Sequence, residues 1–188
     1  MAITQLDRIA ALIVVDLQKG VVALPTFQPS SEIVSRSAEL AQAFRKRKWP
    51  VVLVNVKPGP PTRTQSGIPT RDLPPDWAEL VPELEQKPGD YLVTKSKVSA
   101  FIGTPLDEYL RRQGVTQTVV AGIATSVGVE MTGRSAYDFG YNVVFVVDAM
   151  TDLNPEAHRY CVENVFPRFG ETDTTDNVLQ MLGVALAQ

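Results

Sequence analysis

Five short runs dominated by valine, isoleucine and leucine recur along the chain, and they constrain its fold more than any other feature. Each run is nearly continuous in apolar residues, which is typical of strands buried on both faces of a sheet. The runs span residues 9–15, 51–56, 91–94, 116–122 and 142–149. Stretches with helical periodicity separate most of them, which predicts a parallel sheet with helices on both faces. We therefore expect an α/β protein: a three-layer α/β/α sandwich with a doubly wound, mainly parallel, Rossmann-like sheet.

The helical stretches carry recognisable start and stop signals. Residues 31–48 have apolar residues at helical spacing and end in four basic residues, where cations complement the helix dipole. Further helices are expected at 104–113, at 126–139 with Gly140 as the stop signal, from Pro155 to about 166 with Asn154 as the cap, and near the C-terminus with Thr174 or Thr175 at its start.

We expect residues 1–188 to form a single domain, because this length with 44% hydrophobic residues supports one sizeable core. A proline-rich segment, residues 57–90, lacks periodicity until about Trp77. Long irregular segments inside compact domains are usually lids or binding loops, so we expect a substrate-side loop here. A tolerated surface insertion is the alternative.

Composition excludes several classes of partner. The formal net charge is −3 and no basic stripe stands out, which argues against nucleic acid and anionic membrane surfaces. No apolar run approaches the roughly 20 residues that span a bilayer. A single cysteine cannot form an intramolecular disulfide, and the N-terminal residues do not resemble a signal peptide. We expect a cytoplasmic protein that acts on a small molecule.

Polar residues follow several of the predicted strands. In an open α/β sheet, ligands bind outside the carboxyl ends of the strands, and Asp16 and Lys95 stand at two such ends. Burial raises the pKa of a carboxyl group and a nearby lysine lowers it, so this pair can form an acid–base site. A structural ion pair is the alternative. For Asp148, after another strand, capping of the following turn is the stronger reading.

No other arrangement of residues competes with this pair. The chain has one histidine, His158, so neither a histidine metal set nor a Ser-His-Asp triad is available. The glycines form neither a GxGxxG motif nor a Walker loop. We therefore expect no metal and no cofactor. We expect His158 to pack in the fold or at an interface, and Cys161 to be a small buried apolar group.

Three segments, in this order, resemble the isochorismatase-like hydrolases, also called cysteine hydrolases: ALIVVDLQKG, VTKSKVSAFIGTPLDEYLRRQGV and VVAGIATSVGVEMTGRSAYDFGYNVVFVVDAMTD. The resemblance runs from about residue 9 to 180. It implies that Asp16 is the catalytic aspartate and that Lys95, ahead of the SAF motif at residues 99–101, is the catalytic lysine. It also implies a cis peptide between Ile123 and Ala124, near the backbone N–H groups that face the site.

Gly128 departs from the pattern of the amidohydrolase members, whose motif GIxTxxCVE has a cysteine at this place. A covalent acyl-enzyme is not available without a thiolate. Isochorismatases resemble this chain, since they also lack that cysteine while they keep the aspartate and the lysine. The resemblance then implies that Asp16 protonates a vinyl ether carbon, that Lys95 positions Asp16 and stabilises the changing charge, and that Gly128, a vacant nucleophile position, leaves room for an enolpyruvyl group.

The predicted substrate contacts come from two places. Ile123, Ala124 and Thr125 line the site after the fourth strand, and three cations of the proline-rich segment would bind substrate carboxylates: Lys57, Arg63 and Arg71. Position 57 is glutamine in isochorismatases, a difference that bears on the substrate.

The sequence therefore predicts a cofactor-free hydrolase of a small carboxylated substrate, with cleavage of an enol-ether C–O bond and release of pyruvate as the first choice. Two alternatives stay open: a non-catalytic ligand-binding or oligomeric scaffold, and C–N amide hydrolysis by activated water. The family resemblance also implies a homo-oligomer, for which helices 126–139 and 155–166 offer contact surfaces.

Overall fold

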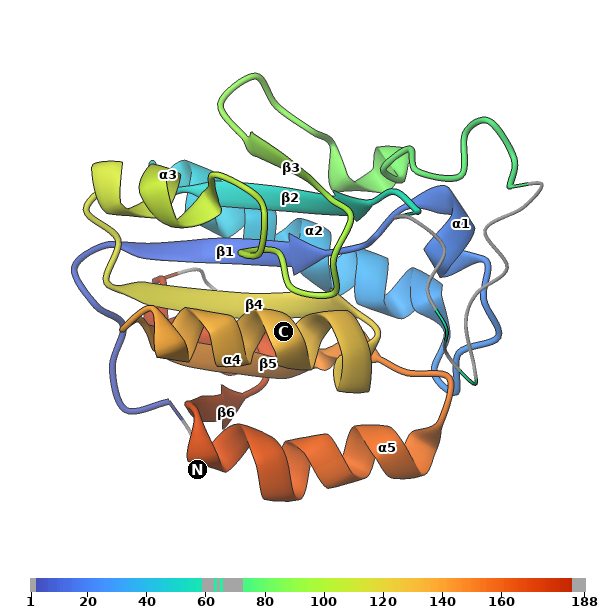
Figure 1. Ribbon diagram of the computed structural model, residues 1–188. Coiled ribbons are helices and arrows are strands. Elements are labelled where there is room, and N and C mark those ends of the chain that lie inside the picture. The colour runs from blue at the N-terminus through green and yellow to red at the C-terminus, as the bar shows by residue number, and fades with distance from the viewer. Residues whose placement is uncertain (1–2, 59–62, 64, 66–72, 184–188) are drawn as a thin grey trace.

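The computed structural model describes residues 3–58, 63, 65 and 73–183. Its centre is a six-stranded sheet in the order β3-β2-β1-β4-β5-β6, in which all neighbouring strands are parallel (Figure 1). The strands are β1 (Ala10–Val15), β2 (Val51–Val56), β3 (Tyr91–Lys95), β4 (Gln117–Ile123), β5 (Asn142–Thr151) and β6 (Glu171–Asp173). This order, in which the chain starts at the centre and reverses direction once, is that of a doubly wound Rossmann-like sheet.

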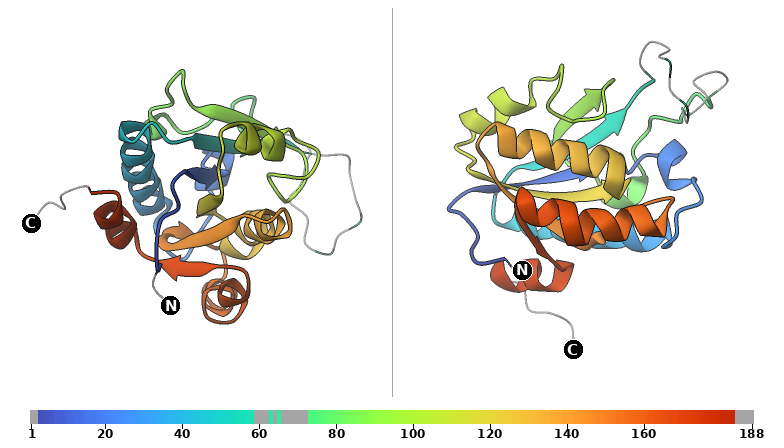
Figure 2. Two further views of the ribbon diagram at one scale, coloured as in Figure 1. Left: turned by 90° about the vertical axis from the view of Figure 1, so that its left-hand side faces the viewer. Right: turned by 60° about the horizontal axis from the view of Figure 1, so that its bottom comes forward.

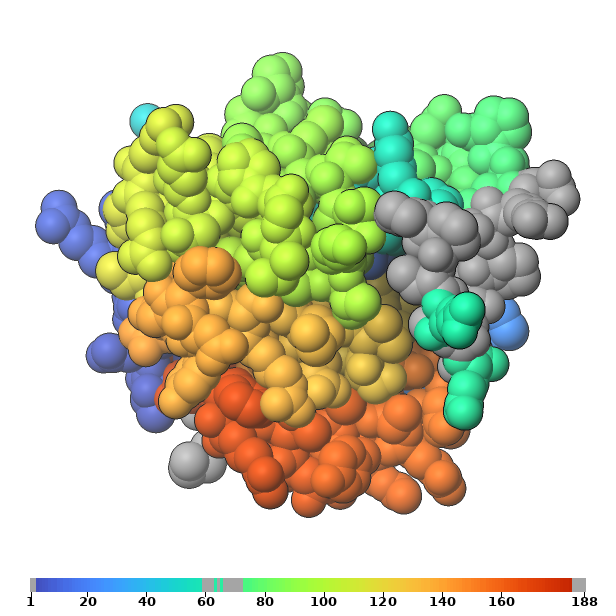
Figure 3. All heavy atoms as spheres, viewed as in Figure 1, coloured from blue at the N-terminus to red at the C-terminus, as the bar shows by residue number. Residues whose placement is uncertain are grey.

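Helices cover both faces of the sheet. The α-helices are α1 (Lys19–Val22), α2 (Ser30–Lys46), α3 (Leu106–Arg112), α4 (Glu130–Asp138), α5 (Pro155–Tyr160) and α6 (Thr175–Met181). Figure 2 shows α2 and α6 on one face and α3, α4 and α5 on the other. In Figure 3 the atoms of α3, α4 and α5 form a continuous layer over their face. The predicted three-layer α/β/α architecture is thus confirmed.

Four shorter turns complete the helical structure. Two are π-helical, η2 (Thr125–Val129) directly before α4 and η3 (Cys161–Val165) directly after α5. Two are 3₁₀ turns, η1 (Pro82–Leu84) and η4 (Phe166–Arg168). The helix expected from Pro155 to about 166 therefore changes its hydrogen-bond pattern at Cys161.

The central strand β1 shows why the apolar runs are continuous. All six of its residues are buried. Leu12 and Val14 belong to the core that α2 and α6 complete, whereas Ile13 and Val15 belong to the core beneath α3 and α4. Because successive side chains of a strand point to opposite faces, a strand between two helical layers needs apolar residues at every position.

The boundary signals in the sequence are also confirmed. Gly140, which follows the C-cap residue Phe139 of α4, has φ +88°, the left-handed conformation in which glycine commonly ends a helix. The Asn154 side chain accepts hydrogen bonds from two backbone N–H groups at the start of α5, and the Thr174 hydroxyl accepts one at the start of α6. Such caps satisfy N–H groups that have no partner within the helix.

The sequence analysis did not predict helix α1 or strand β6, and strand β5 is longer than predicted. The four-residue helix α1 and the three-residue strand β6 are too short for a periodic pattern. Strand β5 continues to Thr151, with a register shift against β4 between Val120 and Gly122. Within the described residues, no helix is both long and apolar enough to cross a membrane.

Candidate active site

The candidate site lies at the carboxyl ends of the central strands, on the right-hand side of the sheet in Figure 1. Asp16 directly follows β1 and Lys95 is the last residue of β3. Strand β2 lies between these two strands, so the Lys95 side chain reaches across the end of β2. Its Nζ atom lies 2.7 Å from Asp16 Oδ2. The two residues, 79 positions apart in the sequence, therefore form a direct ion pair.

Burial sets the electrostatics of this pair. Asp16 is 5% exposed and Lys95 3% exposed. The Oδ2 atom of Asp16 accepts the bond from Lys95, while Oδ1 is buried and has no hydrogen-bond partner in the described part of the chain. Burial raises the pKa of Asp16 to about 6, although the adjacent Lys95 ammonium acts in the opposite direction. A carboxyl group with this pKa exists in both protonation states near neutral pH, as acid–base chemistry requires.

Gly128 lies against this carboxylate. It is a buried residue of the π turn η2. A Cβ atom at this position would lie 3.1 Å from Asp16 Oδ2 and 3.1 Å from Val15 Cγ1. The backbone of η2 therefore packs closely against the Asp16 carboxylate, and even a methyl group at this position would press on the carboxylate.

The peptide bond between Ile123 and Ala124 is cis, as the family resemblance implies. Ile123 and Thr125 are buried on either side of the half-buried Ala124. The Thr125 Oγ1 atom lies 2.8 Å from Nδ1 of His158, whose ring packs against Phe27 with the centroids 5.0 Å apart. Burial lowers the pKa of His158. As expected, His158 is a packing residue, and its contact holds the start of η2.

Two aspartates near the end of β5 have structural contacts. Asp152 Oδ2 accepts hydrogen bonds of 2.7 Å from both the backbone N–H and the hydroxyl of Ser126, which fixes the first turn of η2. Asp148 accepts bonds from Thr175 at the start of α6 and forms an ion pair with Arg36. Asp148 therefore has a structural role, but at the start of α6 and not in the turn that follows its strand, as the sequence analysis had expected. The sequence analysis missed Asp152.

The SAF motif joins the segment after Lys95 to α4. The Ser99 hydroxyl lies 2.8 Å from the hydroxyl of Ser135, and the Ala100 backbone N–H donates to Thr132 Oγ1 over 3.1 Å. Because α4 continues from η2, these bonds hold the strand end that carries Lys95 at a fixed distance from the turn that carries Gly128.

Of the three predicted substrate-binding cations, the structure places one beside the candidate site. Lys57 directly follows β2, is exposed, and donates its backbone N–H to the carbonyl oxygen of Lys95 over 2.9 Å. Its position is therefore beside the candidate site. Arg63 is exposed, and Arg71 lies outside the described residues.

Cys161, the only cysteine of the chain, lies on η3, which directly follows α5. It is buried, and its Sγ donates to Glu130 Oε2 over 3.0 Å. Burial and the adjacent Glu130 carboxylate raise the pKa of the Cys161 thiol to about 12. The thiol therefore stays protonated near neutral pH, and the nucleophilic thiolate form is scarce, which agrees with the expected role of Cys161 as a small buried group.

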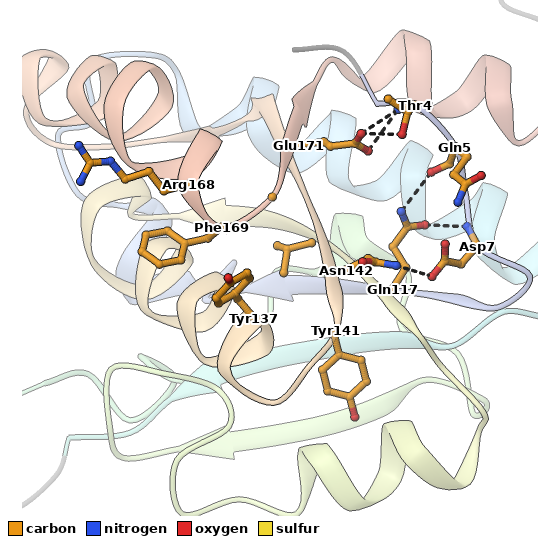
Figure 4. A pocket seen from close by; sticks show the side chains of 12 residues that line it. Thr4, Gln5, Asp7, Gln117, Tyr137, Tyr141, Asn142, Arg168, Phe169 and Glu171 are labelled. Atoms are coloured by element: carbon orange, nitrogen blue, oxygen red, sulfur yellow. Dashed lines mark hydrogen bonds between the residues drawn. The ribbon is translucent and has the colours of Figure 1, made fainter.

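A cavity of about 360 Å³ opens at the opposite, amino end of the sheet (Figure 4). Its polar side chains bond to one another: Glu171 accepts from Thr4, and Asp7 accepts from the side chain of Asn142. Gln117 bonds there to the backbone of Gln5 and of Asp7. Among the described residues, none that was predicted for the active site lines this cavity.

The raised pKa of Asp16 makes a prediction about stability. The folded state keeps the Asp16 proton up to about pH 6, whereas the unfolded chain releases it near pH 3.8, so this stabilising contribution is lost as the pH rises through 6. Relative to Asp16→Asn, the wild type should lose about 3 kcal/mol of unfolding free energy between pH 3 and 7, because one pKa unit corresponds to about 1.4 kcal/mol. Urea unfolding of both proteins across this range measures the difference. A pH-independent difference would show that Asp16 titrates normally in the folded protein.

Comparison with known proteins agrees with this arrangement. The family model described as "Isochorismatase domain" matches residues 10–177. YwoC of Bacillus subtilis, an uncharacterized isochorismatase family protein, is 39% identical over 181 residues, which cover 92% of this chain and 93% of YwoC. A probable isochorismatase of Pseudomonas chlororaphis is 31% identical over 176 residues, covering 90% of this chain and 84% of the relative.

The solved structure of an isochorismatase family protein from Burkholderia thailandensis has a TM-score of 0.91 and 39% sequence identity, and it covers 96% of this chain and 98% of that one. Fold, sequence match and structural likeness agree over nearly the whole chain. The chain belongs to the isochorismatase family and is an isochorismatase-like hydrolase.

Proposed function

We propose that this hydrolase acts without a cofactor on a small carboxylated substrate, cleaves an enol-ether C–O bond and releases pyruvate. The observation that carries the proposal is the buried Asp16–Lys95 pair, in which one carboxylate oxygen is bound and the other has no partner in the described residues. The relative named as a probable isochorismatase supports the same chemistry.

In the proposed reaction, Asp16 in its protonated form transfers its carboxyl proton to the terminal vinyl carbon. The electron pair of the vinyl double bond forms the new C–H bond, which leaves an oxocarbenium ion at the ether carbon. Water adds to this carbon and returns a proton to the Asp16 carboxylate. The hemiketal then breaks its C–O bond to the ether oxygen, which takes up the hydroxyl proton, and gives pyruvate and an alcohol. Lys95 stabilises the carboxylate that Asp16 becomes, since the two groups are already in contact.

We infer that Gly128 stands where the amidohydrolase members have their nucleophile, and that its missing side chain avoids crowding the Asp16 carboxyl. Lys57, beside the end of β3, is the cation best placed to bind a substrate carboxylate. Ile123, Ala124 and Thr125 would line the same site through the backbone.

The proposal predicts that Gly128→Ala separates activity from stability. The new Cβ, 3.1 Å from Asp16 Oδ2, would crowd the proton donor, and we expect kcat/KM to fall about tenfold, which corresponds to about 1.4 kcal/mol of transition-state stabilisation. The free energy of unfolding should change by less than about 1 kcal/mol, because the helix preference for alanine over glycine opposes the crowding of the new Cβ against Val15 Cγ1. Unchanged kcat/KM would remove the argument that this position must stay open.

Amide hydrolysis by activated water is a second candidate. With a pKa of about 6, much of the Asp16 carboxyl is ionised at pH 7 and can act as a base. The two functions have different products. A panel of enolpyruvyl ethers, including isochorismate, and simple amides should be assayed for pyruvate with a coupled dehydrogenase and for ammonia. Pyruvate from the ethers supports the proposal, whereas ammonia from amides without pyruvate supports the second candidate.

We also infer that the protein is a homo-oligomer. Exposed apolar side chains lie on η2, α4 and α5: Val127 and Tyr160 are more than half exposed, and Met131 is 42% exposed. Light scattering should give a multiple of the mass of one chain, and Val127→Glu with Met131→Glu should reduce it. A wild-type protein with the mass of one chain would contradict this inference.

A further inference from the structure

Gln18 is a buried polar residue that the proposed chemistry does not use. It stands two positions after Asp16 and is 0% exposed. A buried carboxamide is costly unless its donors and its acceptor are satisfied. Its contacts therefore indicate what the side chain does.

The carboxamide of Gln18 continues the hydrogen-bond ladder of the sheet beyond the end of β1. The Asp16 backbone N–H donates to Val54 of β2 over 2.9 Å, and after this bond the main chain turns away. At Val56 the Gln18 side chain takes the place of the missing strand. Its Oε1 accepts from the Val56 N–H over 2.7 Å, and its Nε2 donates to the Val56 carbonyl over 3.1 Å.

The second hydrogen of Nε2 reaches a different segment. It donates to the carbonyl oxygen of Trp77 over 3.1 Å, so one amide joins the end of β2 to the described end of the proline-rich segment. The backbone around Gln18 meets that segment as well, because the Gly20 N–H donates to Trp77 and the Val81 N–H donates to Leu17. A Cβ on Gly20 would lie 1.9 Å from the Trp77 ring, which shows how closely the two segments pack.

Between these anchors lies a strained turn. Asp16 has φ +55°, a left-handed conformation that costs a non-glycine residue roughly 1–2 kcal/mol. The Gln18 backbone N–H closes the turn on the Asp16 carbonyl over 2.9 Å. Such a conformation persists only where its surroundings fix it. The Gln18 side chain fixes it by its hydrogen bonds to Val56 of β2 and to Trp77 of the proline-rich segment.

We propose that Gln18 is a positioning residue for Asp16: its carboxamide holds the left-handed turn that keeps the Asp16 carboxyl buried against Lys95. An amide is required here, because the side chain must accept once and donate twice at the same point. This proposal depends on the proposed function in one respect: the carboxyl group that Gln18 positions is the proposed acid.

The test is the titration of Asp16 in Gln18→Met, a variant of similar length that makes none of the three bonds. The Asp16 carboxyl is followed by ¹³C NMR and assigned by its loss in Asp16→Asn. A loosened turn admits water, so we expect the pKa of Asp16 to fall from about 6 toward the ordinary value of about 3.9. An unchanged titration in folded Gln18→Met would overturn the proposal.

Asn55→Leu is the matched control. The Asn55 side chain anchors the same segment, at the carbonyl of Ala78 over 2.7 Å, but it is not part of the turn at Asp16. We expect the Asp16 titration to stay unchanged in this variant. An equal fall in both variants would assign the effect to the segment and reject the specific role of Gln18.

Two further results keep the outcome clear. If Gln18→Met does not fold, the same titration is measured in Gln18→Asn, which keeps the amide but shortens its reach. If neither variant folds, Gln18 has a folding role and the positioning role is rejected. With an active substrate, the folded variant should lose kcat with little change in KM. If wild-type Asp16 does not titrate near pH 6, the proposed acid is wrong, whereas a difference between wild type and variant still decides the role of Gln18.

Discussion

Replacement of Asp16 by asparagine is expected to lower kcat by about 10²- to 10⁴-fold, the range that general acid–base groups usually contribute. The asparagine keeps the shape of the side chain but has no carboxyl proton to transfer. Lys95 then faces a neutral amide oxygen, so the site is preserved in outline while its acid is lost. Steady-state kinetics with the substrate found in the pyruvate and ammonia assays measures the effect, and circular dichroism checks the fold.

Asp148→Asn is the control for this experiment. Asp148 also follows an apolar run, but it bonds to Thr175 and Arg36 and not to Lys95. Its replacement should reduce stability and leave kcat within about twofold, because surface and capping groups act on folding and not on the transition state. An Asp16→Asn variant with the wild-type rate would show that the assigned mechanism is wrong.

Replacement of Lys95 by methionine is expected to lower kcat by about 10²-fold, the lower end of the range for acid–base partners. Methionine fills a similar volume but cannot stabilise the Asp16 carboxylate that forms when the proton leaves. The Lys95 ammonium also lowers the pKa of Asp16, so its removal should raise this pKa above about 6. The pH–rate profile should therefore lose amplitude while its alkaline limb moves to higher pH.

Lys87→Met provides the matched control, since Lys87 forms an exposed pair with Glu85. Such surface pairs are worth little, and both the rate and the pH profile should stay as in the wild type. If the alkaline limb of Lys95→Met stays in place while activity falls, the lysine acts on the substrate directly and not through Asp16.

Much of the fold could be predicted from the sequence because its strands are buried on both faces. Continuous apolar runs and cap residues identified five strands and the longer helices within about two residues at most ends. The strand β6 could not be found this way, because its three residues are defined by pairing with β5 and not by a pattern of their own. The helix α1 was missed because its four residues are too few to show a helical period.

The candidate site divides in a similar way. The sequence analysis could pair Asp16 with Lys95, because the carboxyl ends of parallel strands lie at one edge of the sheet. Asp152 was missed because the register shift in β5 decides which of two aspartates reaches the start of η2. Gln18 was missed because its partners are backbone groups of Val56 and Trp77, and no sequence pattern records such contacts.

The most direct measurement is hydrolysis of an enolpyruvyl ether in ¹⁸O-labelled water, with mass spectrometry of both products and of the intact protein. The account predicts that water attacks the carbon that becomes the pyruvate carbonyl, so the alcohol product carries no ¹⁸O. It also predicts that the protein mass stays unchanged during turnover, since no side chain acts as the nucleophile. Label in the alcohol, or a covalent adduct on the protein, would contradict the proposed role of Asp16 and the open position at Gly128.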